Sequence, residues 1–204
     1  MDDIVKQAMA KWPNVPAVYG WLGLDRRGKW LIKGSPVPNP AIAGFISRNY
    51  EHDAEGRWYF QNGPQRVYVA LDYTPFIYRF GWDPDPSAPP RIETHTGKAV
   101  TRIDSAWIDE AGVVLLATEH GLGLMDDRDL DRVLSCFNDE HGAALTEDAL
   151  VTAVERLQAG DNTSLYFRYR ESSVPVSPIK ARRVAPKFGF VPRPAQRAGE
   201  EECI

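Results

Sequence analysis

Three copies of a short turn pattern, Asp-x-x-Gly, constrain the fold of this chain more than any other feature. They occupy residues 25–28, 53–56 and 109–112, and each lies between segments rich in aromatic and branched side chains. An Asp at the first turn position accepts backbone hydrogen bonds, and the Gly takes the left-handed conformation that closes a short bulged loop. The pattern therefore predicts three antiparallel β-hairpins.

An amphipathic helix is expected after the first and the third hairpin. Asn39 and Pro40 can begin one helix, and Asp126 or Asp127 can cap another whose apolar positions include Leu130 and Phe137. The first and third turns are separated by 84 positions, at both the Asp and the Gly. We expect an α+β fold of two pseudo-repeats of antiparallel hairpins, each packed with an amphipathic helix.

Changes in composition along the chain predict its domain boundaries. Residues 1–82 form the first unit, and residues 83–91, rich in proline and aspartate, form a stiff linker. Residues 92–170 form the second unit, with a helix at 147–158 capped by Thr146 and ended by Gly160. Residues 171–204 contain many prolines and basic residues, which predicts an extended or disordered tail.

Charge and cysteine content favour a cytoplasmic protein. The net charge of -4 gives no overall attraction to nucleic acid or anionic lipid. The acidic start does not resemble a signal peptide, and no apolar run approaches the roughly 20 residues of a membrane helix. The only two cysteines, Cys136 and Cys203, do not make a disulfide framework or a zinc cluster.

The best candidate for a metal site is formed by His120, Asp126 and Asp127. Aspartates at alternate positions from 127 resemble the start of a calcium loop, but Arg132 stands where such a loop requires glycine. These acids are better explained as caps of a helix N-terminus. His95 or His120 could be combined with Asp104 and Cys136 as a catalytic trio, but Cys136 adjoins an apolar stripe. We expect no cofactor, and the sequence favours a protein that is not an enzyme.

Aromatic residues concentrate in the first unit, where the run 57–60 reads Arg-Trp-Tyr-Phe. Because neighbouring strand residues face opposite sides of a sheet, these rings cannot all be buried on one face. The rings on the second face therefore either pack on a helix or the other repeat, or line a groove for a ligand or partner. The candidate groove residues are Trp30, Arg57, Trp58, Phe60, Gln65, Arg66 and Trp82.

Residues 20–76 resemble the N-terminal half of a proteobacterial family of unknown function. The matching positions are Trp21, Asp25, Gly28, Trp30, Gly34, Pro36, Pro40, Asp53, Gly56, Pro75 and Phe76. The resemblance implies two related α+β repeats, a link to signal transduction and no demonstrated enzymatic activity. We expect a bacterial, non-catalytic, regulatory protein. It would bind a small molecule or a protein partner in the seam between its repeats, and the protein could form a dimer. The alternatives are a metal-dependent hydrolase using His120 and the nearby aspartates, and weak nucleic-acid binding by the basic tail.

Overall fold

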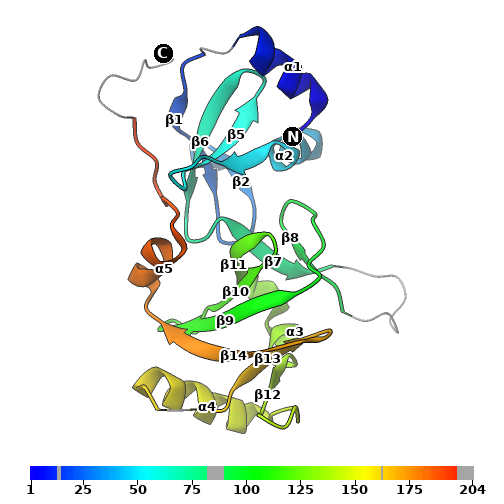
Figure 1. The fold of residues 1–204 in the computed structure, drawn as a ribbon, viewed down its shortest axis with the longest axis vertical. Helices are drawn as coiled ribbons and strands as arrows, with labels where there is room; N and C mark the ends of the chain where they lie inside the picture. Colours follow the sequence, from blue (N-terminus) through cyan, green and yellow to red (C-terminus); the bar gives the residue numbers. More distant parts are fainter. Residues whose placement is uncertain (13–14, 82–89, 162, 197–204) are drawn as a thin grey trace. The chain divides into compact units, whose positions relative to one another are not determined.

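The computed structural model describes residues 1–12, 15–81, 90–161 and 163–196. The chain divides into two compact units (Figure 1). Unit 1 contains Met1–Pro75, His95–Gly97 and the described residues from Ala185 onward. Unit 2 contains Phe76–Thr94 and Lys98–Val184. Both units combine helices with a β-sheet, so the predicted α+β class is confirmed.

Unit 1 is a six-stranded sheet with strand order β3-β2-β1-β6-β5-β4. Strands β1 and β6 are parallel, and all other neighbouring pairs are antiparallel. The elements of this unit are α1 (Asp3–Lys11), β1 (Val18–Leu24), β2 (Trp30–Ile32), β3 (Ser35–Pro36), α2 (Pro40–Arg48), β4 (Tyr50–His52), β5 (Trp58–Asn62) and β6 (Gln65–Leu71).

Unit 2 has an eight-stranded sheet with strand order β12-β13-β14-β9-β10-β11-β7-β8. In Figure 1 the helix α4 runs beside β13 and β14. The elements are β7 (Phe76–Phe80), β8 (Ile92–Thr94), β9 (Ile103–Asp109), β10 (Val114–Thr118), β11 (Gly121–Met125), η1 (Asp127–Asp129), α3 (Leu130–Leu134), β12 (Phe137–Asn138), α4 (Glu147–Ala159), β13 (Tyr166–Tyr169) and β14 (Ser172–Ile179). Helix α5 (Ala181–Phe188) follows β14.

Six strands of unit 2 follow the same order as the six strands of unit 1. The order β11-β10-β9-β14-β13-β12 corresponds to β3-β2-β1-β6-β5-β4. In each case the central pair, β9 with β14 or β1 with β6, is parallel. Strands β7 and β8 extend the second sheet beyond β11.

The three predicted Asp-x-x-Gly turns connect β1 to β2, β4 to β5, and β9 to β10. In each turn Oδ1 of the aspartate, Asp25, Asp53 or Asp109, accepts hydrogen bonds from the backbone N–H groups two and four residues later, at 2.8–3.0 Å. The three hairpins are therefore confirmed. Asp139 makes the same two contacts in a fourth turn, 139–142, which follows β12.

Both long predicted helices are present. Asn39 caps α2 by accepting from Ala41 N at 2.9 Å, and Ile46 on this helix is buried. Thr146 caps α4 by accepting from Ala149 N at 3.3 Å, and Gly160 ends it in the left-handed conformation. The helix predicted after Asp126 is shorter than expected, because Phe137 pairs with Phe167 in a strand instead of continuing the helix.

Two segments differ from the predicted domain organisation. Residues 76–80 were assigned to the first unit, but as β7 they pair with β11 and β8 in the sheet of unit 2. The tail prediction is wrong for residues 172–188, because β14 lies in the middle of that sheet and α5 follows it. The linker prediction falls mainly on residues 82–89, which lie outside the described residues.

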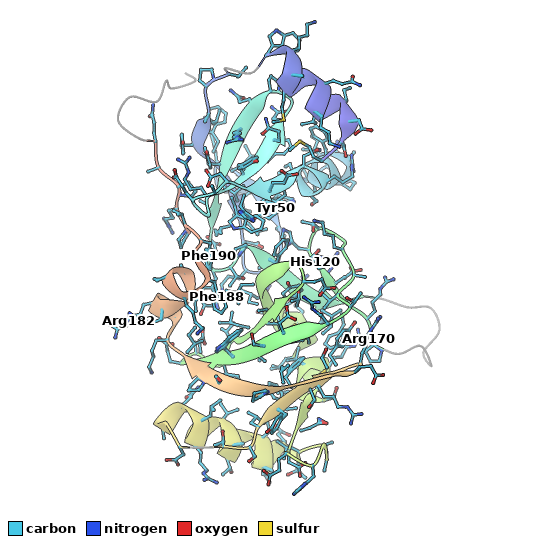
Figure 2. The ribbon with its side chains drawn as sticks, in the orientation of Figure 1. Tyr50, His120, Arg170, Arg182, Phe188 and Phe190 are labelled. Carbon is cyan, nitrogen blue, oxygen red and sulfur yellow. The ribbon has the colours of Figure 1, made fainter. Side chains whose placement is uncertain are left out.

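The described residues that follow α5 pack on unit 1. Val191 N donates to Gly56 O at 2.9 Å, and Leu71 N donates to Pro192 O at 2.7 Å. Phe190, labelled in Figure 2, is 7% exposed. This strap, residues 189–192, therefore joins the end of the described chain to the turn at Asp53 and to the end of β6.

None of the helices in the described ranges is long and apolar enough to cross a membrane.

Candidate functional site

The predicted groove residues do not form one site. The register of β5 against β6 explains this, because Phe60 faces the same side as Val67, and Tyr59 faces the other side with Tyr68. Phe60 contacts Phe45 of α2, which identifies the first side as the face that α2 covers. The candidates consequently separate into a core cluster, an apolar groove and a pocket on the opposite face. Trp82 lies outside the described residues.

Trp30 and Trp58 belong to the core of unit 1. Trp30 is 3% exposed, and its indole N–H donates to Ser47 Oγ on α2 at 2.9 Å. Both indoles pack on Tyr50, which Figure 2 labels in unit 1, with ring centroids 5.0 Å and 4.7 Å away. Burial raises the pKa of Tyr50, whose hydroxyl donates to Pro75 O at 3.1 Å. These two tryptophans therefore stabilise the fold and do not present a surface to a ligand.

Phe60 and Gln65 line an open groove between α2 and the sheet. This apolar groove has a volume of about 470 Å³. Its lining residues are Val18, Trp21, Leu22, Ile32, Ile42, Phe45, Ile46, Phe60, Asn62, Gln65 and Val67. Asn62 and Gln65 pair in the register of β5 and β6, so the polar side chains lie together at one end of an apolar wall.

Three large apolar side chains of this groove are exposed to solvent. Trp21, Ile32 and Ile42 have exposed fractions of 49%, 44% and 48%. Trp21 lies in the part of β1 where the register to β6 shifts, between Val18 and Leu22, so the strand alternation does not bury its ring. The sequence places Trp21 in a structural motif and among the aromatic residues of the first unit, but Trp21 was not one of the candidate groove residues. A bulge caused by the Gly20 backbone, with φ of 72°, was not anticipated.

Arg57 and Arg66 meet in a pocket on the other face of the same sheet. We call it the tyrosine–arginine pocket, and its volume is about 530 Å³. Its described lining residues are Met9, Trp12, Val15, Pro16, Ala17, Tyr19, Arg57, Gln61, Pro64, Arg66 and Tyr68. Tyr19 stacks on Tyr68 with ring centroids 4.6 Å apart. The two guanidinium groups each lie 4.7 Å from a tyrosine ring centroid, Arg57 over Tyr68 and Arg66 over Tyr59.

Asp53 holds one side of the tyrosine–arginine pocket in place. Its Oδ2 accepts from Arg57 Nε at 2.7 Å and from the Tyr68 hydroxyl at 3.1 Å. Burial opposes the charged carboxylate, but the hydrogen bonds from Arg57 and Tyr68 outweigh it and lower the pKa of Asp53. The turn that makes the hairpin therefore also orients Arg57 and Tyr68.

The predicted metal residues lie in unit 2, where Figure 2 labels His120. Its Nε2 lies 2.9 Å from Ala99 O, and Thr118 Oγ1 accepts from its backbone N–H. Asp126 is 2% exposed, accepts from Arg128 N at 3.0 Å and forms an ion pair with the Arg128 side chain. Across the described ranges, no group of three or more His, Cys, Asp or Glu side chains could hold a metal ion.

The residues of the possible catalytic trio have structural contacts. Asp104 Oδ1 accepts from Arg102 Nε at 2.8 Å. Cys136 is half-buried, and burial raises the pKa of its thiol to about 11. A thiol with that pKa is almost fully protonated near neutral pH and is a poor nucleophile.

The chain is an α+β protein of two units. Each unit has a sheet in which six strands follow the same order, together with short helices. The chain belongs to the family described as "Protein of unknown function (DUF2946)", whose model, DUF2944, matches residues 1–195. The predicted membership of a family of unknown function is confirmed. No curated protein matches the chain.

Two solved structures of DUF1285 family proteins are similar to part of the chain. The protein from Silicibacter pomeroyi DSS-3 is 18% identical, with a TM-score of 0.44, over 61% of this chain and 74% of that chain. The protein from Shewanella baltica OS155 is 16% identical, with a TM-score of 0.41, over 58% of this chain and 90% of that chain.

Proposed function

We propose that this protein is a non-catalytic binding module whose apolar groove in unit 1 takes a small ligand with an apolar body. The observation that carries the proposal is the convergence of Trp21, Ile32 and Ile42 on one groove, each with nearly half of its surface exposed. Large apolar side chains that gather at an exposed concave surface mark ligand or partner sites more often than scattered ones do.

The size and chemistry of the groove favour a small molecule. Its volume of about 470 Å³ is within the range of pockets that hold small ligands. None of the described residues that line it has a titratable side chain, so the groove offers no general acid, general base or charged nucleophile. Asn62 and Gln65 supply hydrogen-bonding groups at one end. The ligand would therefore be an uncharged or weakly polar molecule with one polar end.

A duplication is part of the proposal. The shared strand order of the two sheets and their parallel central pairs support descent from one repeated unit. The fourth Asp-x-x-Gly turn supports it further, because Asp139 precedes the equivalent of β5 as Asp53 precedes β5. Helix α4 would then be an insertion specific to the second copy, since unit 1 has only the turn between β4 and β5.

A regulatory role in the cytoplasm completes the proposal. Binding without chemistry is what a regulatory protein needs, because a ligand alters such a protein by favouring one of its states. The predicted seam between the units, the predicted dimer and a protein partner stay predictions.

The test uses N-phenyl-1-naphthylamine, a neutral probe that fluoresces in apolar surroundings. We expect the full chain to bind it saturably with one site per chain. Ile42→Ser should weaken this binding at least fivefold, because it replaces an apolar wall of the groove by a hydroxyl. Val151→Ser is the matched control, since Val151 is an aliphatic residue on the exposed side of α4 with 53% of its surface exposed.

Equal binding by Ile42→Ser and Val151→Ser would contradict the proposal. Thermal unfolding of both variants is measured in parallel, and we expect each to melt close to the parent protein because both side chains are exposed. If Ile42→Ser unfolds, Trp21→Ala replaces it, since that ring is also exposed and lines the same groove.

A further inference from the structure

The second cavity of unit 1, the tyrosine–arginine pocket, lies on the sheet face opposite the apolar groove. We propose that it is a binding site for a small aromatic anion, such as an aromatic carboxylate, whose charge pairs with Arg66. This site is distinct from the apolar groove, because no described residue lines both cavities. Tyr19 and Tyr68 line it, together with residues of α1, residues 15–17 and the β5–β6 hairpin.

The tyrosine surface that a flat ring can reach comes from the half-buried Tyr19, because Tyr68 is only 3% exposed. Tyr19 and Tyr68 are nearly parallel, at 12°, and Tyr59 meets Tyr68 edge-on with centroids 6.0 Å apart. Trp12 adds a ring at the rim, where it is 51% exposed. Aromatic side chains arranged at different angles favour an aromatic guest, which can stack on one ring and contact the edge of another.

The two arginines of the pocket differ in how their charge is compensated. Arg57 is held by Asp53 at 2.7 Å and by Glu55 at 3.4 Å, so its charge is balanced within its own hairpin. Arg66 lies over the Tyr59 ring and forms no ion pair with any described residue. Arg57 therefore orients Tyr68, and Arg66 is the cation that remains for a ligand.

The nearby carboxylate on this face does not compensate Arg66. Glu51 pairs with Tyr59 in the register of β4 and β5, which places it on the same face of the sheet. Its Oε1 lies 4.0 Å from the N-terminal amine of Met1. At the rim, Lys11 Nζ lies 4.5 Å from the Trp12 ring centroid, which adds a second cation on the side of α1. The local balance therefore favours an anionic guest.

Gln61 provides a second observation that points to a ligand. It is 1% exposed, and its Nε2 donates to Gly63 O at 2.9 Å. That contact fixes the orientation of the amide, because a flipped amide would place two oxygens together. Its Oε1 is buried and has no hydrogen-bond partner among the described residues. A buried acceptor of this kind favours a ligand that also carries an N–H or O–H donor.

An aromatic anion would use all of these features. Its carboxylate would accept the N–H groups of Arg66, a geometry that guanidinium groups favour. Its ring would pack on Tyr19 and Trp12, and a donor on the ring would pair with Gln61 Oε1. A neutral aromatic molecule would keep only the stacking.

The test compares 2-naphthoate with 2-naphthamide, its neutral analogue, by calorimetric titration of the full chain. We expect 2-naphthoate to bind with a dissociation constant on the order of 0.1 mM, the scale for a ligand of this size. The amide should bind at least tenfold more weakly. Arg66→Gln should remove this preference, and Arg66→Lys should retain the preference with several-fold weaker binding because the planar fork is lost.

Arg26→Gln is the matched control. Arg26 also lies over a tyrosine, 4.8 Å from the Tyr73 ring centroid, but it does not line the pocket. We expect this variant to bind 2-naphthoate like the parent protein. Equal binding of the acid and the amide, or an equal loss in the Arg26 and Arg66 variants, would overturn the proposal. Ile42→Ser should leave the preference for the acid unchanged, and a loss there would assign the binding to the apolar groove instead.

Discussion

Gly56 lies so close to Gly189 that a Cβ atom on Gly56 would collide with the Gly189 carbonyl oxygen. This contact joins the turn at Asp53 to the strap of residues 189–192. The backbone of Gly56 also has a φ of 75°, a conformation that favours glycine. One residue therefore serves both the hairpin and the docking of the strap.

We expect Gly56→Ala to destabilise unit 1 more than the left-handed backbone alone would. An alanine forced into that conformation costs about 1–2 kcal/mol, and overpacking adds about 1–3 kcal/mol. Urea unfolding followed by tryptophan fluorescence measures the change, and limited proteolysis between residues 181 and 196 reports release of the strap.

Gly112→Ala separates these two effects. Gly112 occupies the same turn position with a φ of 80°, but a Cβ there would meet nothing within 4 Å. We expect only the cost of the backbone conformation and no new cleavage near the strap. Equal losses of stability in the two variants would show that the strap does not press on Gly56.

Asp126→Asn should show that Asp126 stabilises unit 2. Burial opposes its charged form, but hydrogen bonds from Arg128 outweigh burial and hold the pKa of Asp126 below the ordinary value of 3.8. A carboxyl with a lowered pKa contributes stability that is complete well above 3.8 and is lost as the pH falls through the lower, folded-state pKa. The variant should therefore lose about 1–2 kcal/mol at pH 6, the scale of a lost helix cap, and the difference should shrink below pH 3.8.

The comparison is made by urea unfolding between pH 6 and pH 3. Asp131→Asn is the control, because Asp131 is an exposed aspartate of the same segment, and we expect its stability to change by less than about 0.5 kcal/mol. A constant difference between Asp126→Asn and the parent protein across this pH range would contradict the assigned role of the carboxylate.

The thiol of Cys136 should react slowly in the folded protein. Burial raises its pKa from 9.0 to about 11, so the thiolate fraction at pH 8 falls about 100-fold. The reaction with Ellman's reagent is followed in a Cys203→Ser background, where Cys136 is the only thiol. We expect a rate at least 100-fold below that of the same protein in urea, and comparable rates would argue for an exposed, activated cysteine.

Local patterns predicted the elements of the fold well. The Asp-x-x-Gly turns, the Asn39 cap and the Thr146 cap were all identified because the groups that form them lie within four residues of one another. The turn at Asp139 has the same chemistry but was missed. It follows a strand of only two residues, and Ala143 and Ala144 come after it instead of a run of branched or aromatic residues, so the strand signals that marked the other turns are weak.

Pairings between distant segments could not be predicted in the same way. The apolar pattern of residues 76–80 indicates a strand but does not specify whether it joins β11 or β6. Pro175 and Pro178 disfavoured a strand in residues 172–179, and tertiary pairing with β9 and β13 overrides this local tendency.

The candidate site shows the same division between local and distant information. Strand alternation correctly separated Tyr59 from Trp58 and Phe60, so the sequence indicated that one ring must lie on the other face of the sheet, where Tyr59 is buried. It could not show that Trp30 and Trp58 meet Tyr50 in the interior. The exposure of Trp21 depends on a register shift in β1, and a glycine such as Gly20 can indicate a bulge without specifying the strand against which the register shifts.

The place of β14 in unit 2 sets an order of events during protein synthesis. All six strands of the first sheet have been made once residue 71 leaves the ribosome, whereas the second sheet lacks a central strand until residue 179 emerges. Strand β9 would present an unpaired edge from the time residue 109 is made until β14 is complete, and such edges invite association with other chains. The second sheet therefore waits longer for its central parallel partner than the first, where β1 ends at residue 24 and β6 at residue 71.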